Sequence, residues 1–110
     1  MEMLIIKIGK KYFFLNKNKI DWIESEGSYL KIHTENKYYI IRMSLIDIES
    51  KLNSDIFIRI NRSTIININK VKELTDTKQS TEFVVVLNNE TILKWKRRYR
   101  KNFPETLLVK

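Results

Sequence analysis

Hydrophobic residues in this chain recur mainly with a period of two, in short runs separated by turn-prone pieces such as Gly9-Lys10-Lys11. Because successive side chains of a β-strand point to opposite faces, this period predicts strands rather than helices. Asn88-Asn89 predicts a hairpin turn between the last two strands, since asparagine tolerates a positive φ. We therefore expect a mostly β protein, with strands at residues 4–8, 12–15, 20–24, 29–33, 38–41, 57–60, 64–68, 71–74, 82–87 and 91–95.

One segment, at about residues 44–53, departs from this period and is predicted to be a short helix. Ser44 is suited to cap it, with Asp47 in a capping-box position. A second short helix, at about residues 96–103, is expected to stop before Pro104. A helix-turn-helix fold needs two adjacent periodic helices with a basic second one, so the pattern argues against that fold. The apolar residues of the first helix share one face, which we expect to pack against the core: Leu45, Ile48 and Leu52.

The length of 110 residues indicates one domain, over residues 1–110, with a single core. Its apolar runs are too short and too interrupted for a transmembrane helix. Met1-Glu2 is not followed by the basic and apolar regions of a secretory signal, so a cytoplasmic location is expected. The chain has no cysteine, which excludes disulfides and thiolate metal sites.

Positive charge is concentrated near the C-terminal end of the sequence. The formal net charge is +8, and residues 90–110 hold seven Lys/Arg against two Asp/Glu. Lys94 to Lys101 (KWKRRYRK) has six basic residues in eight, interleaved with Trp95 and Tyr99. Lys and Arg bind phosphates, Arg also reads guanine, and aromatic rings pack on sugar or base. The block favours nucleic acid, while anionic lipid, an acidic protein or a merely solvated helix would also suit its charge.

The segment Phe57 to Asn67 (FIRINRSTIIN) places polar side chains that can bond phosphate or base edges among β-branched residues. In a regular strand, Phe57, Arg59 and Asn61 would share one face, opposite Ile58, Ile60 and Arg62. Two arginines and an asparagine at a strand end, followed by Ser63-Thr64, fit a phosphate-rich partner. An ordinary edge strand with solvated charges is the plainer interpretation.

The residues give no indication of an enzyme. His33 is the only histidine, so a metal site would depend almost wholly on carboxylates, and none is expected. The chain has two glycines, Gly9 and Gly27, and therefore lacks a glycine-rich phosphate loop. We expect no cofactor and no small-molecule substrate.

Three segments together resemble a known family: IDWIESEGSYLKIHT (20–34), FIRINRSTIININKVKEL (57–74) and the Arg97-Arg98-Tyr99 stretch after a β-hairpin. They are similar to the LytTR DNA-binding domain, the output module of bacterial response regulators of the LytR/AgrA type. The resemblance covers about residues 4–103. It implies an elongated, mostly β fold of small antiparallel sheets with one short helix. It also implies binding to double-stranded DNA through loops that enter successive major grooves.

The resemblance assigns DNA contacts by position in three places. They are the turn at Ser28, Tyr29 and Lys31; then Asn61, Arg62 and Ser63, flanked by Arg59; and then Arg97 and Arg98, with Lys96. We expect Arg62 and Arg98 to read base edges, and Lys96, Arg97, Arg100 and Lys101 to hold phosphates. The family most often has His at position 61 and Ser at position 96. Asn pairs bidentately with adenine and Lys favours guanine or phosphate, so base preference is expected to differ.

The resemblance also bears on partners. Family members commonly engage tandem half-sites in pairs, which makes a homodimer on DNA a candidate assembly. The chain would be either the output half of a two-component regulator or a stand-alone regulator, and no membrane partner is expected. Two alternatives stay open from the residues: a basic module that docks an acidic protein, and single-stranded nucleic-acid binding by stacking on Trp95, Tyr99 and Tyr29.

Overall fold

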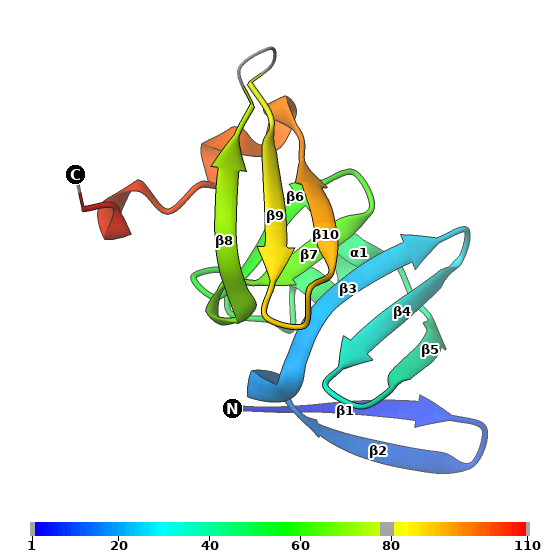
Figure 1. Cartoon of the computed structure of the whole chain (residues 1–110). Coiled ribbons are helices and arrows are strands. Elements are labelled where there is room, and N and C mark those ends of the chain that lie inside the picture. Colours follow the sequence, from blue (N-terminus) through cyan, green and yellow to red (C-terminus); the bar gives the residue numbers. More distant parts are fainter. Residues whose placement is uncertain (1, 78–80, 110) are drawn as a thin grey trace.

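The computed structural model describes residues 2–77 and 81–109 (Figure 1). Within these residues, strands form at all the positions that the alternating pattern predicts, with small differences at their ends. Their bounds are β1 Met3–Ile8, β2 Lys11–Asn16, β3 Ile20–Glu26, β4 Tyr29–Thr34, β5 Tyr38–Arg42, β6 Phe57–Asn61, β7 Thr64–Asn67, β8 Val71–Asp76, β9 Phe83–Leu87 and β10 Ile92–Trp95.

The strands form three antiparallel sheets. β1 and β2 make a hairpin, β8, β9 and β10 make a three-stranded sheet, and the remaining strands make a five-stranded sheet in the order β5-β4-β3-β7-β6. In Figure 1 the three-stranded sheet lies above the five-stranded sheet, and the β1–β2 hairpin lies below it. The molecule measures 49 × 27 × 25 Å along its principal axes, so the expected elongated fold of small antiparallel sheets is confirmed.

The helices are short. α1 covers Leu45–Glu49, and the Ser44 hydroxyl accepts the amide of Asp47 at 3.1 Å, as the capping prediction requires. The helix ends sooner than expected. The Ser50 hydroxyl donates to the Asp47 carbonyl, and the amides that follow bond to carbonyls three residues earlier, as in turns. The second expected helix is a 3-10 helix, η3. The 3-10 helices are η1 Lys17–Lys19, η2 Ile68–Lys70, η3 Arg97–Asn102 and η4 Glu105–Leu107.

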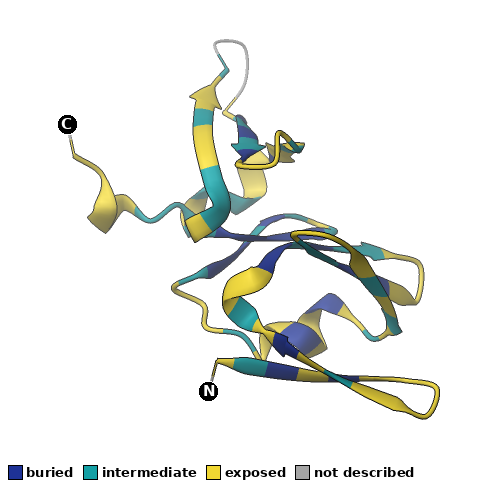
Figure 2. Ribbon diagram, turned by 60° about the horizontal axis from the view of Figure 1, so that its bottom comes forward, coloured by how far each residue is buried: buried dark blue, intermediate teal, exposed yellow. Residues whose placement is uncertain are grey.

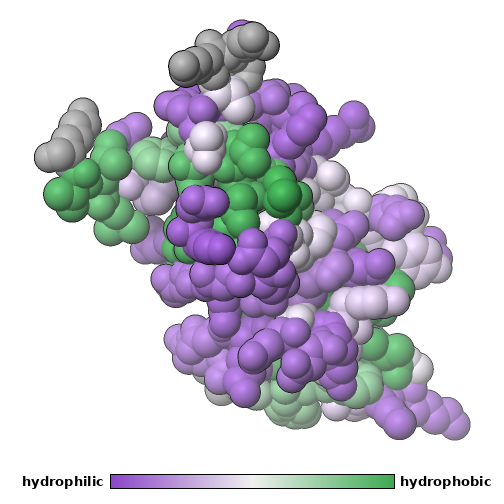
Figure 3. Space-filling view, viewed as in Figure 1, coloured by the Kyte–Doolittle hydropathy of each residue, from purple (hydrophilic) through white to green (hydrophobic). Residues whose placement is uncertain are grey.

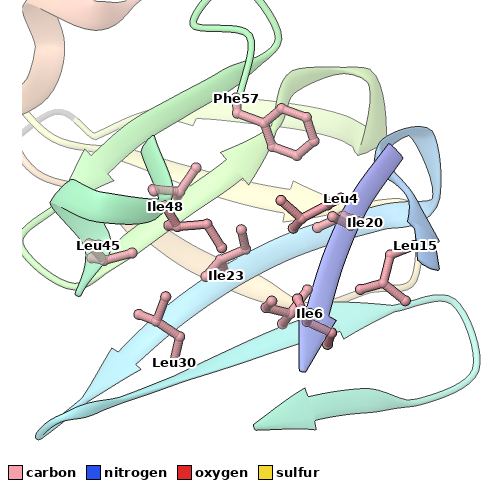
Figure 4. Packing of buried hydrophobic residues seen from close by; sticks show 11 residues of the cluster. Leu4, Ile6, Leu15, Ile20, Ile23, Leu30, Leu45, Ile48 and Phe57 are labelled. Atoms are coloured by element: carbon pink, nitrogen blue, oxygen red, sulfur yellow. The ribbon is translucent and has the colours of Figure 1, made fainter. Parts of the chain in front are cut away.

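Buried side chains form two clusters on opposite faces of the five-stranded sheet, rather than the single core expected from the length. The hairpin cluster lies between this sheet, the β1–β2 hairpin and α1 (Figure 4), and contains Leu4, Ile6, Leu15, Ile20, Ile23, Leu30, Ile32, Leu45, Ile48, Phe57 and Ile65. The three-strand cluster lies beneath β8–β10 and contains Ile58, Ile60, Ile66, Phe83, Val85, Leu87 and Trp95. β6 and β7 contribute to both clusters, and they are buried along much of their length (Figure 2).

The β9–β10 turn differs in detail from the sequence prediction. The turn does include Asn88 and Asn89, but the residue with positive φ is Glu90, at 72°. The Glu90 amide donates to the Leu87 carbonyl at 2.9 Å, and the Glu90 carboxylate pairs with Lys72 at 2.7 Å. These contacts hold a left-handed conformation that a glutamate rarely adopts unaided.

Candidate nucleic-acid interface

The β3–β4 turn and the β6–β7 turn lie side by side at one end of the five-stranded sheet. β3 pairs with β7, so that Glu24 faces Thr64. One step beyond this pair, the Ser25 amide donates to the Ser63 carbonyl at 2.8 Å. Both turns lie on the right-hand side of Figure 1. Sheet pairing therefore unites two segments that are more than thirty positions apart in the sequence.

The chain that leaves β10 joins these turns from the other sheet. The Lys96 amide donates to the Ile60 carbonyl at 2.8 Å, and the Asn61 side-chain amide donates to the Lys94 carbonyl at 2.9 Å. We call residues 25–31, 61–63 and 94–101 together the three-segment edge. Figure 3 shows hydrophilic side chains along this side of the molecule, next to an apolar area over β9 and β10.

A β-bulge sets the direction of Asn61. Arg59 is opposite Ile65 and Asn61 is opposite Thr64, so Ile60 is an extra residue in β6. A bulge turns the following side chain away from the face that regular alternation would give it. The prediction that Asn61 shares a face with Arg59 is therefore wrong: Arg59 meets Glu49 of α1, whereas Asn61 is directed toward β10.

The amide group of Asn61 is engaged within the protein at both of its ends. Its Oδ1 accepts the Ser63 amide at 2.9 Å and lies 3.3 Å from the Ser63 hydroxyl. Its Nδ2 donates to the Lys94 carbonyl. Bidentate pairing with adenine would compete with these bonds. In this structure Asn61 shapes the β6–β7 turn and ties it to β10.

Arg59 is also held by the protein. Its Nε donates to the Asn61 carbonyl at 2.9 Å, and its Nη2 donates to the Arg62 carbonyl. Its Nη1 donates to the Glu49 carboxylate at 2.8 Å, and its side chain is only 19% exposed. Arg62, at the tip of the same turn, is exposed, and its guanidinium has no protein partner among residues 2–77 and 81–109. The two arginines therefore differ in their availability to an outside ligand.

The basic residues after β10 divide in the same way. Lys96 pairs with Glu82 at 3.3 Å. Arg100 donates to Asp76 at 3.3 Å and to the Thr81 carbonyl at 2.9 Å, with its guanidinium 3.8 Å from the centre of the Phe83 ring. Of the basic residues in 96–101, those that are exposed and make no ion pair or side-chain hydrogen bond within the described structure are Arg97, Arg98 and Lys101.

The β3–β4 turn presents Ser28 and Tyr29 to solvent, and the Tyr29 side chain is 49% exposed. Gly27 has φ of 60°, which glycine adopts without strain. Lys31 lies further along β4, where its ammonium is 4.3 Å from the centre of the Tyr38 ring on β5. The structure thus brings the three predicted segments together, but within them it directs the Lys31 side chain toward β5 and the Arg100 side chain toward the β8–β9 hairpin.

Two residues of this region were not among the predicted site residues. Glu49 holds Arg59, and Tyr99 lies between two arginines, with its ring centre 5.7 Å from the Arg59 guanidinium and 6.0 Å from that of Arg98. The sequence suggests Tyr99, within the basic block, only for stacking on single-stranded nucleic acid. Glu49 carried no local signal, because its partner is ten positions away and outside its helix.

Other parts of the described chain show packing rather than chemistry. His33 stacks on Trp22 at 4.1 Å and its Nε2 lies 2.7 Å from Glu24. No group of three or more His, Asp or Glu residues in residues 2–77 and 81–109 is placed to hold a metal ion. Over the same residues, no helix has the length and apolar character needed to cross a membrane.

Comparison with known proteins identifies the family. The model of the LytTr DNA-binding domain matches residues 10–108. Over 106 residues, 96% of this chain, the sequence is 31% identical to the transcriptional regulatory protein LytR of Staphylococcus aureus (strain N315) and 24% identical to the sensory transduction protein LytT of Bacillus subtilis (strain 168). The chain spans 43% and 44% of these relatives, less than half of each.

The fold has a solved counterpart. The LytTr DNA-binding domain of a response regulator from Bacillus cereus superposes with a TM-score of 0.83 over 99% of both chains, at 22% identity. The family consists of DNA-binding domains of transcription regulation and is not a family of enzymes, in agreement with the reading of the residues. With nearly its whole length matched by the family model, this chain belongs to the LytTR family of DNA-binding domains.

Proposed function

We propose that the chain binds double-stranded DNA in a sequence-specific manner, with the three-segment edge inserted into successive major grooves. The observation that carries this proposal is the convergence of three turns and strand ends, one of them strongly basic, on a single edge. Exposed arginines at turn tips suit base edges, since Arg pairs bidentately with guanine.

Within this proposal, Arg62 and Arg98 read bases. Both are exposed on the edge and make no ion pair within the described residues, so both are free to pair with guanine. Arg97 and Lys101 hold phosphates and set the register of the protein on the duplex. Ser28 and Tyr29 contact DNA from the β3–β4 turn. Five of the other predicted residues support the edge from within: Arg59, Asn61, Ser63, Lys96 and Arg100. The proposal gives Lys31, whose ammonium faces the Tyr38 ring, no DNA contact.

The relatives indicate the biological setting. Because they are regulators more than twice as long as this chain, we infer that the domain serves as the output module of a two-component regulator. It would act in the cytoplasm, on tandem half-sites occupied by a pair of domains. The single-stranded alternative loses support from the structure, since Trp95 is fully buried and donates to the Tyr99 carbonyl at 2.8 Å. A stacking platform needs exposed aromatic faces.

Enrichment from a random-sequence duplex library, at near-physiological salt and with a single-stranded control, tests the proposal. A recurring duplex motif in two half-sites is expected. Salt-sensitive binding of duplex without any enriched motif would overturn sequence-specific recognition and favour a basic protein-docking surface. Preference for the single-stranded control would overturn groove reading.

The role of Arg62 has a separate test, made by comparing the enriched duplex with a scrambled one. Arg62→Ala should weaken binding to the enriched duplex by about 1–3 kcal/mol and relax preference at one base position. Lys101→Gln should weaken binding to both duplexes alike and lower the salt dependence. Equal loss of affinity for both duplexes in Arg62→Ala would show that Arg62 holds a phosphate and does not read a base.

A further inference from the structure

The guanidinium of Arg59 connects the β6–β7 turn with helix α1 through three hydrogen bonds. We propose that Arg59 and Glu49 form a positioning pair, which fixes the turn so that Arg62 meets the DNA in one orientation, and that Arg59 is not itself a DNA contact. This inference rests on the proposed function and assigns a role to two residues of the same edge. It replaces the direct contact that the family resemblance implies for Arg59.

The donors of the Arg59 guanidinium form a planar fork directed at the β6–β7 turn. Nε and Nη2 of Arg59 donate to the carbonyls of two consecutive residues, Asn61 and Arg62. Two bonds from one planar group to adjacent carbonyls fix the orientation of both peptide planes. Only arginine has donors in such a rigid fork, since lysine carries a single ammonium on a flexible stem. The direction in which the Arg62 side chain leaves the turn is therefore set by Arg59.

The Arg59 guanidinium is also anchored to the core. Glu49 accepts from Nη1 at 2.8 Å, and it is the last residue of α1. That helix is fixed by Ile48, fully buried in the hairpin cluster, and by Leu45. On the other side, the Asn102 amide donates to the backbone carbonyl of Arg59 at 2.8 Å. The turn is thus held against both α1 and η3, so that its position does not depend on DNA.

The charge of Arg59 is less available to DNA than that of Arg62. A phosphate contact releases counterions because a free cation neutralises the phosphate. The Arg59 charge is already paired with Glu49, whose side chain is 42% exposed, so a nearby phosphate would also face that carboxylate. Three of the five N–H donors of an arginine are used within the protein. In contrast, Arg62 has neither an acidic partner nor an internal hydrogen bond from its guanidinium in the described structure.

Glu49→Ala separates the two roles, with Asp47→Ala as its matched control. Both variants remove one negative charge from α1, and the Asp47 carboxylate makes no hydrogen bond or ion pair within residues 2–77 and 81–109. The measurement is the affinity for the enriched duplex and for a scrambled duplex, by fluorescence anisotropy at several salt concentrations. A thermal melt of each variant confirms that it is folded.

For Glu49→Ala, the ratio of specific to scrambled affinity should fall by about tenfold, the size of one lost base contact. Asp47→Ala should raise both affinities slightly and leave their ratio unchanged. Arg59→Lys should lower the ratio as Glu49→Ala does. In an Arg62→Ala background, the effect of Glu49→Ala on the ratio should disappear, because the pair acts through Arg62.

A Glu49→Ala variant that binds both duplexes more tightly at an unchanged ratio would overturn the inference, because it would show Arg59 released to hold a phosphate. A full effect of Glu49→Ala in the Arg62→Ala background would also overturn it. Failure of the proposed function is recognised separately, since the parent protein would then show no preference between the two duplexes.

Discussion

Arg97 and Arg100 lie on the same 3-10 helix, and the structure predicts opposite consequences of replacing them with glutamine. Arg97 is exposed and its side chain makes no hydrogen bond, ion pair or ring contact with the described residues, whereas Arg100 is bound to Asp76, to the Thr81 carbonyl and to the face of Phe83. The substitution removes the same charge from the same element in both cases. Differences between the two variants therefore report the environment of each side chain.

The magnitudes follow from these contacts. Arg97→Gln should lower the slope of log affinity against log salt by about 0.9, the value for one neutralised phosphate, and should leave stability unchanged. Arg100→Gln should lower the free energy of unfolding by about 1–2 kcal/mol, from an exposed ion pair and a cation–π contact. That loss corresponds to a melting temperature lower by about 5–10 °C.

Fluorescence anisotropy with a labelled duplex at four or five salt concentrations measures the slope, and a thermal melt followed by circular dichroism measures stability. Arg100→Gln should change the slope by clearly less than Arg97→Gln. The reasoning is refuted if both variants lower the slope equally while both keep the parent melting temperature. In that case the internal contacts of Arg100 would not restrict its use by DNA.

Three further predictions concern stability. Asn67 is 1% exposed, and its side-chain amide donates to the Ile20 carbonyl at 2.9 Å. Urea unfolding of Asn67→Ala should therefore show a loss of about 1–3 kcal/mol in the free energy of unfolding. No loss would mean that water replaces the bond. Burial raises the pKa of the Asp21 carboxyl above its ordinary value of 3.8, and the opposing effect of the nearby Lys70 charge is smaller. The folded state therefore favours the protonated carboxyl, and the stability that this group contributes is lost as pH rises through the folded-state pKa. Asp21→Asn should therefore melt higher than the parent at neutral pH and equally below pH 3.8; a lower melting temperature at neutral pH would contradict this. In Gly27→Ala the added Cβ would meet no atom within 4 Å, but the residue keeps a φ of 60°. A thermal melt should therefore show a loss of about 1 kcal/mol in the free energy of unfolding from backbone strain alone, and a much larger loss would indicate a steric clash.

Local features of the fold could be predicted from the sequence because they depend on neighbouring residues. Alternation of apolar and polar side chains located the strands, and the Ser44 cap located the start of α1. The end of that helix was placed too late, although the Ser50 hydroxyl that donates to the Asp47 carbonyl lies only three positions away. The pairing of β3 with β7 joins distant segments and leaves no local signal. For the same reason, the two clusters on opposite faces of one sheet were not foreseen.

The candidate site shows the same division. The sequence identified which residues are basic and which lie at strand ends. It could not tell that Arg59 and Arg100 are engaged by Glu49 and Asp76, because these acids lie in other elements. It also missed the bulge at Ile60, a residue whose carbonyl accepts the amide of the distant Lys96.

The most direct test of the central claim is a nuclear magnetic resonance titration of the isotope-labelled domain with its enriched duplex. The amide shifts that change most should belong to the three-segment edge, residues 25–31, 61–63 and 94–101. Amides of the β1–β2 hairpin should change little, because that hairpin lies beyond the hairpin cluster on the far side of the five-stranded sheet. Large changes centred on the β1–β2 hairpin, with the three-segment edge unaffected, would contradict the proposed mode of binding.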